Sequence, residues 1–189
     1  AINELRRKAI SLLDEKRMYT IQFKEKDYKL DVPDFAKEQK FTIYVKDLDD
    51  YNSIKNQECD EIYMDIDLYN EINDPRKVLK LDRVITNYPV YKNTLLVGEV
   101  GSINKYKDIY TDFSLNVTNA YTVALLHHLG VKKITLSYEM NDYQIEKLLA
   151  NYEKLYGKHP NLELIVDALP EVMVSKFNLL TKYNLKGDT

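Results

Sequence analysis

The chain has 189 residues, a length that suits one domain with a sizeable hydrophobic core, or one domain with an appendage. Its formal net charge of −3 is too small to indicate a nucleic acid, a membrane surface or a polyanion as a partner. No apolar run is long enough to cross a bilayer, and the single cysteine, Cys59, excludes an internal disulfide and favours a reducing, cytoplasmic location. The chain begins at Ala1, and we expect a piece of a longer protein with other domains.

The first forty residues predict a helix, a ribbon and a linker. Apolar residues recur at helical spacing over residues 2–17, and apolar and polar residues alternate over residues 19–30. Proline and polar residues then indicate a linker up to Lys40. We therefore assign residues 1–40 to the tail of a preceding domain and residues 41–189 to a partial barrel domain, with the helix and ribbon packed outside it.

From residue 41 onward, β-rich and helical segments alternate. The predicted strands cover residues 41–45, 61–67, 78–86, 95–101, 110–117, 132–140 and 161–167. Helices are predicted after Asp47 and after Asp74–Pro75, from Ala120, from Asp142 to a stop at Gly157, and from Met173. This alternation indicates an α/β fold with a mainly parallel sheet. Seven evenly spaced strands favour a TIM-barrel-like (β/α) barrel that is one strand short of closure, and an open doubly wound sheet is the alternative.

Polar side chains cluster near the carboxyl ends of the predicted strands, where ligands meet the chain in parallel α/β folds. Asp112 and Asn116 fall on one face of a strand at period two, and burying them costs free energy unless they are paired or used. Ser137 and Glu139 share one face of the next predicted strand. Helix capping explains Asn119 alone, and it is also an alternative role for Ser137 and Glu139.

Two segments of this region carry a family resemblance. Residues 112–119 read Asp-Phe-Ser-Leu-Asn-Val-Thr-Asn, and residues 136–140 read Leu-Ser-Tyr-Glu-Met. They resemble the signature of peptidase family U thirty-two, the collagenase-like peptidases of unknown catalytic type, and the resemblance covers most of residues 41–180. It implies a barrel fold and hydrolysis of peptide bonds, although other members of the family are associated with RNA hydroxylation.

The resemblance weakens toward the carboxyl end of the chain. The family has a Pro-Leu-Met-x-Ser-x-x-Cys segment, which aligns with residues 171–178. Met173 and Ser175 are retained there, but Glu171 stands at the proline and Asn178 at the cysteine. The chain is therefore either an enzyme domain or a non-catalytic barrel module, and a peptide and an RNA both remain open as its substrate.

The resemblance and the strand-end positions together give the predicted site. The predicted catalytic residues are Asp112, Asn116, Ser137 and Glu139. The predicted substrate-binding residues are Asp65, Asp67, Glu99, Asn119 and Asp167. All except Asn119 are expected to meet at one mouth, where crowded carboxylates should have raised pKa values or hold a divalent cation. The alternative is that these residues cap helices and pair with lysines. We assign no cofactor and no resident metal, and the sequence leaves the oligomeric state open.

The acidic residues around Cys59 should raise the pKa of its thiol and make it unreactive. We therefore expect the Cys59→Ser variant to keep its melting temperature and any activity. A thermal melt and an activity assay check this, and a large loss of activity would refute the inert role of Cys59.

Overall fold

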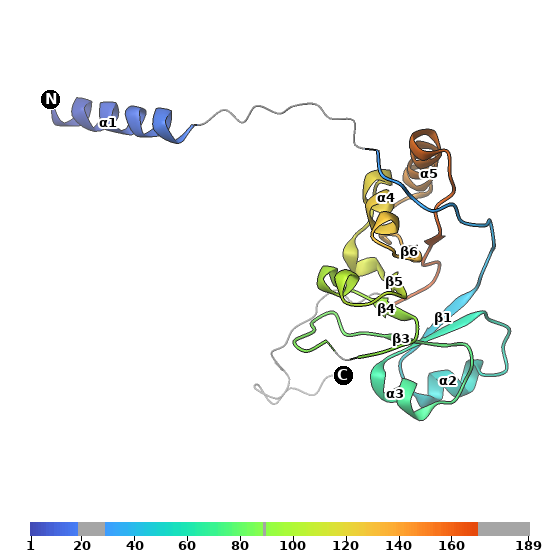
Figure 1. Ribbon diagram of the computed structural model, residues 1–189. Helices are drawn as coiled ribbons and strands as arrows, with labels where there is room; N and C mark the ends of the chain where they lie inside the picture. Colours follow the sequence, from blue (N-terminus) through green and yellow to red (C-terminus); the bar gives the residue numbers. More distant parts are fainter. Residues whose placement is uncertain (19–28, 89, 170–189) are drawn as a thin grey trace, which may run out of the picture.

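The computed structural model describes residues 1–18, 29–88 and 90–169. Within these ranges, seven short parallel strands form one sheet in which each strand pairs with the next along the chain (Figure 1). They are β1 (Thr42–Val45), β2 (Glu61–Met64), β3 (Lys77–Lys80), β4 (Leu95–Val97), β5 (Ile109–Thr111), β6 (Lys133–Thr135) and β7 (Leu162–Glu163). The strand order lacks the reversal of a doubly wound sheet. The sheet curls into an incomplete barrel, which confirms the predicted α/β class.

Successive strand residues face opposite sides of the sheet and build two apolar layers. Residues such as Val45, Met64 and Leu79 belong to the main core, which also includes buried residues of α4 and α5. The alternate positions Tyr63 and Leu96, with Val78, form a second, smaller cluster. The helices are α2 (Leu48–Ile54), α3 (Ile66–Glu71), α4 (Ala120–His128) and α5 (Asp142–Tyr156), with two 3₁₀ turns, η1 (Val100–Asn104) and η2 (Phe113–Leu115).

Several helix boundaries follow the local chemistry of the sequence. The carboxylate of Asp47 accepts a hydrogen bond from the backbone N–H of Asp50 at 2.8 Å and caps α2. Asn119 caps α4 in the same way, and Gly157 ends α5 with a φ of +64°. The predicted helix from Asp142 to Tyr156 is confirmed.

Six predicted strands end earlier than expected, and those over residues 78–86, 95–101 and 161–167 end at Lys80, Val97 and Glu163. The strand predicted over residues 61–67 ends at Met64, and α3 begins two residues later. The strand predicted over residues 110–117 ends at Thr111, and the one over residues 132–140 ends at Thr135. After two of these strands, a polar side chain accepts a hydrogen bond from the backbone N–H two residues on, which turns the chain away from the sheet.

The predicted helix after Asp74–Pro75 is wrong, because these residues form a turn that leads into β3. The buried carboxylate of Asp74 accepts hydrogen bonds from the backbone N–H and the guanidinium group of Arg76, the closest at 2.8 Å. These bonds to Arg76 lower the pKa of Asp74 to about 2, against the opposing effect of burial.

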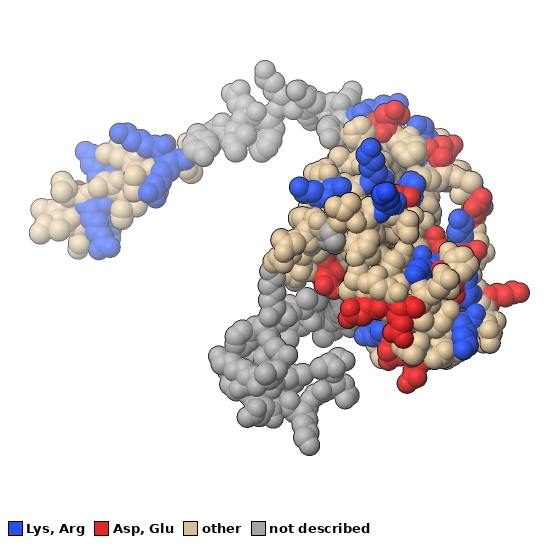
Figure 2. Space-filling view, turned by 60° about the horizontal axis from the view of Figure 1, so that its bottom comes forward, with Lys and Arg blue, Asp and Glu red and all other residues tan. Residues whose placement is uncertain are grey.

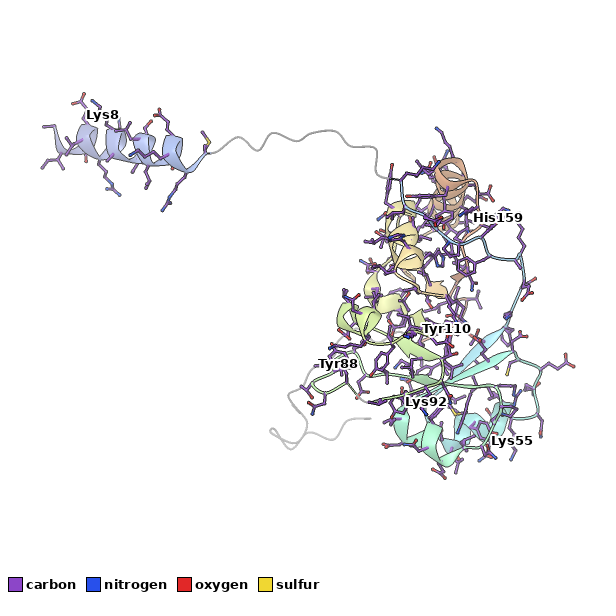
Figure 3. The ribbon with its side chains drawn as sticks, viewed as in Figure 1. Lys8, Lys55, Tyr88, Lys92, Tyr110 and His159 are labelled. Carbon is purple, nitrogen blue, oxygen red and sulfur yellow. The ribbon has the colours of Figure 1, made fainter. Side chains whose placement is uncertain are left out.

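The helix α1 (Ile2–Arg17) forms as predicted, but it does not pack on the barrel. None of its residues is buried, and Lys8 with the rest of α1 stands apart from the body (Figures 1 and 3). The apolar residues of α1 share a helix face with Arg6 and Lys16. Burying these two charged side chains would cost free energy, which opposes packing of this face on the barrel. The predicted helix from Met173 and nearly all of the ribbon over residues 19–30 lie outside the described residues. No helix in the described part of the chain is long and apolar enough to span a membrane.

The segment 29–40 packs against the amino-terminal ends of the strands. Val32 is 3% exposed and belongs to the main core. Asp34 accepts a hydrogen bond from the backbone N–H of His159, and the backbone N–H of Phe35 donates to the carbonyl oxygen of His159. The Phe35 ring lies 4.6 Å from the ring of His127.

His127 on α4 is buried as a neutral imidazole. Its Nδ1 lies 2.8 Å from the carbonyl oxygen of Val131, and the backbone N–H of Asn161 donates to its Nε2 at 3.3 Å. Burial lowers the pKa of His127, and the bond to Val131 offsets this only in part. His127 is therefore protonated at a lower pH in the folded state than in the unfolded chain, where a histidine takes up a proton at a pH of about 6.5.

We expect the protein to lose stability as the pH falls from about 7.5 to about 5.5, because the unfolded chain then binds a proton at His127 that the folded chain does not. The His127→Gln variant should show a smaller change of melting temperature over this range. The His128→Gln variant is the control, since the side chain of this neighbouring histidine is exposed. An equal pH dependence in all three proteins would contradict the assignment.

Candidate functional site

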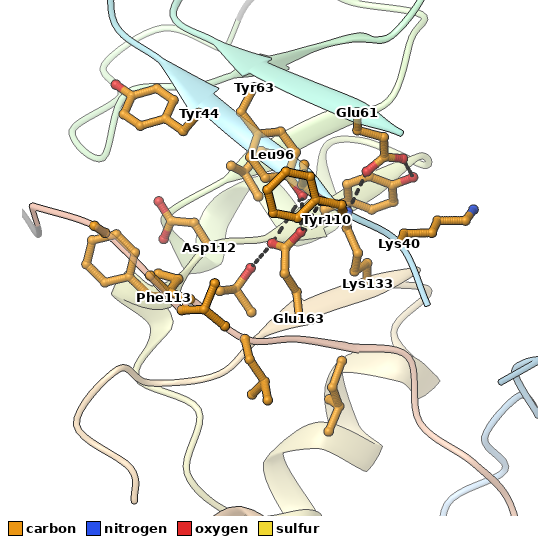
Figure 4. A pocket seen from close by; sticks show the side chains of 18 of the residues that line it. Lys40, Tyr44, Glu61, Tyr63, Leu96, Tyr110, Asp112, Phe113, Lys133 and Glu163 are labelled. Carbon is orange, nitrogen blue, oxygen red and sulfur yellow. Dashed lines mark hydrogen bonds and ion pairs between the residues drawn. The ribbon is translucent and has the colours of Figure 1, made fainter. Parts of the chain in front are cut away.

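The concave face of the sheet borders a cavity of about 990 Å³ (Figure 4). All seven strands contribute side chains to its wall, among them Tyr44, Glu61, Lys80, Leu96, Tyr110, Lys133 and Glu163. The strands contribute mainly charged and aromatic side chains to this wall, whereas the segment after β7 contributes aliphatic ones, among them Leu164, Ile165 and Leu169. The volume lies at the upper end of the range of about 300–1,000 Å³ that is typical of ligand pockets.

Lys133 on β6 carries a buried ammonium group that links three other strands. Its Nζ lies 2.5 Å from Oε2 of Glu61 and 3.0 Å from Oε1 of Glu163. The ring centroids of Tyr110 and Tyr63 lie 4.3 Å and 5.1 Å from the same Nζ. We call these five residues the Lys133 clamp. The clamp ties β2, β5, β6 and β7 together across the concave face.

Glu163 accepts hydrogen bonds from several elements at once. The hydroxyl groups of Thr42 and Tyr63 donate to Oε1, each at 2.9 Å, and Thr135 donates to Oε2 at 2.6 Å. Burial opposes ionisation of Glu163, but Lys133 and the hydroxyl donors outweigh it and lower the pKa of Glu163. The carboxylate is therefore ionised and fully occupied by protein donors.

The two clamp tyrosines are held in their protonated form. Burial raises the pKa of Tyr63, and the adjacent Glu163 raises it further. Burial and the hydrogen bond to Glu61, at 2.8 Å, likewise raise the pKa of Tyr110. Both hydroxyl groups thus act as donors to carboxylates. Because the carboxylate oxygens of the clamp are all hydrogen-bonded within the protein, the clamp shapes the cavity and leaves no obvious position for a ligand.

A second ion pair lies at the carboxyl end of β2. Asp65 accepts a hydrogen bond from the hydroxyl group of Tyr44 at 2.8 Å, and its other oxygen lies 3.3 Å from Nζ of Lys80. The Lys80 ammonium also lies 4.7 Å from the Tyr44 ring centroid. Here too a lysine is held between a carboxylate and an aromatic ring.

Asp112 follows β5 directly and is only 3% exposed. Its Oδ1 accepts hydrogen bonds from the backbone N–H of Ser114, at 2.7 Å, and from the Ser114 hydroxyl group. Its Oδ2 is buried and has no hydrogen-bond partner among the described residues. An unsatisfied buried acceptor costs about 1–3 kcal/mol, so a donor from a ligand that reached this oxygen would remove that cost.

Gly98, at the end of β4, makes room for this arrangement. A Cβ atom at this position would lie 2.8 Å from Oγ of Ser114 and 3.0 Å from Oδ2 of Asp112. The Ser114 hydroxyl also lies 2.7 Å from the carbonyl oxygen of Gly98. Because residue 98 has no side chain, the backbone at the end of β4 can approach the Asp112 carboxylate. This close approach fixes the orientation of the carboxylate.

The structure brings together only part of the predicted site. Asp112 and Asp167 line the cavity, and Asp65 adjoins it through Tyr44 and Lys80. Asp67 is exposed in the first turn of α3, because β2 ends three residues earlier. The predicted convergence of all eight residues at one mouth is therefore wrong.

The other predicted residues serve as local turn and helix groups. Asn116 is exposed and ends η2 with a φ of +49°, so it does not share a strand face with Asp112. Asn119 caps α4, and Glu99 accepts hydrogen bonds from the backbone N–H of Gly101 and the hydroxyl group of Ser102. The capping alternative thus explains Asn119 and Glu99.

Ser137 and Glu139 belong to a turn after β6. The backbone N–H of Glu139 lies 3.3 Å from Oγ of Ser137, while the Glu139 side chain is exposed. Ser137 is buried, and neither residue lines the cavity. The two residues are therefore not paired as a hydroxyl and a carboxylate facing a common ligand.

The expectation of a raised carboxyl pKa is wrong for Glu99, because hydrogen bonds from Ser102 and Gly101 outweigh burial and lower the pKa of this carboxyl group. The described residues include no group of three or more His, Cys, Asp or Glu side chains that could hold a metal ion. Burial raises the pKa of the Cys59 thiol, while Arg76 opposes this and Asp74 and Asp60 add to it.

The Lys133 clamp was not predicted from the sequence. Its partners are separated by long stretches of sequence, 72 residues in the case of Glu61 and Lys133. A signal was present in the alternation of polar residues at positions 133, 135 and 137, and at positions 61, 63 and 65. Alternate polar residues on strands of a closed parallel sheet indicate a polar interior.

Comparison with protein-family models gives no match, and no curated protein or solved structure proves similar to the chain. The resemblance to the collagenase-like peptidases therefore stays a prediction that rests on residues 112–119 and 136–140.

The Lys133→Met variant should be destabilised by about 3–5 kcal/mol, because it leaves Glu61 and Glu163 buried without their cation. Urea denaturation measures the change in the free energy of unfolding. The Lys132→Met variant is the matched control, since this neighbouring lysine is exposed and its ion pair with Asp108 should contribute less than about 1 kcal/mol. Equal losses in the two variants would show that the clamp does not stabilise the fold.

Proposed function

We propose that this chain is part of a hydrolase acting on peptide bonds, of the collagenase-like kind, and that its substrate lies in the concave cavity. In this proposal the seven strands belong to a TIM-type barrel. The observation that carries the proposal is the buried, unpartnered Oδ2 of Asp112 in the wall of a cavity of about 990 Å³. Asp112 lies just beyond the carboxyl end of β5, where such barrels contact their substrates.

Hydrolysis of a peptide bond requires a nucleophile and a group that takes its proton. Among the described residues, no serine, threonine or cysteine side chain is hydrogen-bonded to a histidine, since His127 and His128 bond to backbone carbonyl groups and His159 pairs with Glu153. Water is therefore the nucleophile in this proposal, and its oxygen adds to the carbonyl carbon of the peptide bond. Asp167, an exposed carboxylate that lines the cavity, takes the proton from water and returns it to the amine nitrogen as the C–N bond breaks, while Asp112 contacts the substrate.

The alternatives are a non-catalytic barrel module and a part of an RNA-hydroxylating enzyme. Acidic side chains gather over α2 and α3 (Figure 2), where Asp47, Asp49, Asp50 and Asp67 are exposed. A phosphate backbone would be repelled by this surface. The charge distribution therefore favours a peptide over an RNA as the ligand of this domain.

The wild-type protein should cleave unfolded collagen or short peptides, and mass spectrometry of the products would locate the cleaved bonds. The Asp112→Asn variant should raise KM, because the carboxylate contacts the substrate. The Asp167→Asn variant should lower kcat by about 100-fold, the lower end of the range for loss of a general base.

The Asp49→Asn variant is the control, since its exposed side chain on α2 belongs to neither group. Melting temperatures of all variants check that they fold. If the wild-type protein neither binds nor cleaves any peptide, the hydrolase proposal is wrong, and tight binding of single-stranded RNA instead would favour the RNA-modifying alternative.

A further inference from the structure

The cations of the concave face follow one pattern. Nζ of Lys133 lies over the rings of Tyr110 and Tyr63, and Nζ of Lys80 lies over the ring of Tyr44. Each ammonium group also contacts a carboxylate. A carboxylate next to an aromatic ring is therefore the arrangement by which this face binds positive charge.

Asp112 has similar surroundings, but its Oδ2 has no hydrogen-bond partner among the described residues. Phe113 and Tyr138 line the cavity with it, and their rings lie 5.1 Å apart. Figure 4 shows Tyr44 and Phe113 on two sides of the Asp112 carboxylate. The guanidinium carbon of Arg83 lies 4.7 Å from the Phe113 ring centroid, so this ring already holds one cation. The carboxylate and the rings together form an end of the cavity that suits a positively charged group.

The balance of charge on this face points the same way. It carries four carboxylates, and the facing cations are Lys80, Lys133 and Arg83. The carboxylates are Glu61, Asp65, Asp112 and Glu163. The face therefore has one carboxylate more than it has cations, and Asp112 is the carboxylate whose Oδ2 has no hydrogen-bond partner among the described residues.

A neutral donor would satisfy Oδ2 of Asp112 but would leave the excess negative charge of the face uncompensated. An ammonium or guanidinium group supplies both the N–H donor and the opposite charge. The exposed acidic surface over α2 and α3, which follows β1 and β2, also raises the local concentration of cations (Figure 2).

We infer that the Asp112 end of the cavity is a subsite for the ammonium or guanidinium group of a basic side chain on a bound peptide. The inference rests on the proposed function, because it names the class of substrate that the cavity takes. Asp112 is the residue that determines specificity, and Ser114 and Gly98 hold its carboxylate in position.

The test uses a series of fluorescent peptides that are identical except for one central residue, which is Lys, Arg, norleucine or Glu. Norleucine matches the length of lysine without its charge. The wild-type protein should bind the Lys and Arg peptides about tenfold more tightly than the norleucine peptide, and the Glu peptide least. Equal affinity for the Lys and norleucine peptides would overturn the inference, and this comparison needs no variant.

The Asp112→Asn variant should lose the preference and bind the Lys, Arg and norleucine peptides with similar affinity. The Asp49→Asn variant should keep the preference. If the folded Asp112→Asn protein still prefers the basic peptides, the cation binds elsewhere and the inference is wrong.

If the wild-type protein binds no peptide at all, the proposed function fails, and N-acetyl-lysine methylamide and butylguanidinium then test the subsite alone by calorimetry. If the wild-type protein binds these two compounds and the Asp112→Asn variant does not, the cation subsite is supported even though the protein binds no peptide. Absence of binding would overturn it. Spermidine serves as the third ligand, and a preference for it would assign the subsite to free polyamines and contradict a peptide.

Discussion

The buried ammonium group of Lys133 is the constraint on which the concave face depends. The strands are short, and β6 and β7 share only two pairs of residues in register. So few backbone hydrogen bonds hold β7 only weakly to β6, so contacts between side chains contribute much of the stability of β7 in the sheet. Glu163 provides them, because its carboxylate reaches Thr42 on β1, Tyr63 on β2 and Lys133 on β6. Removing two carboxylates and an ammonium group from water is costly, and only their mutual contacts and the added hydroxyl donors offset that cost.

The two ends of the cavity differ in how well their polar groups are satisfied. Glu61 and Lys133 are the first residues of β2 and β6, and their network is complete within the protein. Asp112 follows the last residue of β5 and keeps an oxygen without a partner among the described residues. This division matches the general behaviour of parallel barrels, in which the amino-terminal face stabilises the fold and the carboxyl-terminal face meets the ligand.

The features that the sequence predicted depend on residues close together in the chain. The caps at Asp47 and Asn119 and the helix end at Gly157 each involve contacts over three or four residues, so a short window contains their cause. Strand lengths were overestimated, because β-branched and aromatic residues continue past Thr111 and Thr135 into turns that side-chain hydrogen bonds create. The Lys133 clamp depends on the register of the strands, and the exclusion of Asn116 from the site depends on the left-handed backbone conformation of that residue. The alternation of polar and apolar residues in the sequence reveals neither.

The direct bond between Thr42 and Glu163 has a consequence for how the chain folds. Every strand pairs with its immediate predecessor, so the sheet grows by short loop closures as the chain is added in order. The contact between β1 and β7 spans 121 residues and has the largest entropic cost of closure among these strands. It therefore forms last, and the rim between β1 and β7 is the first part of the sheet to open when the native state fluctuates.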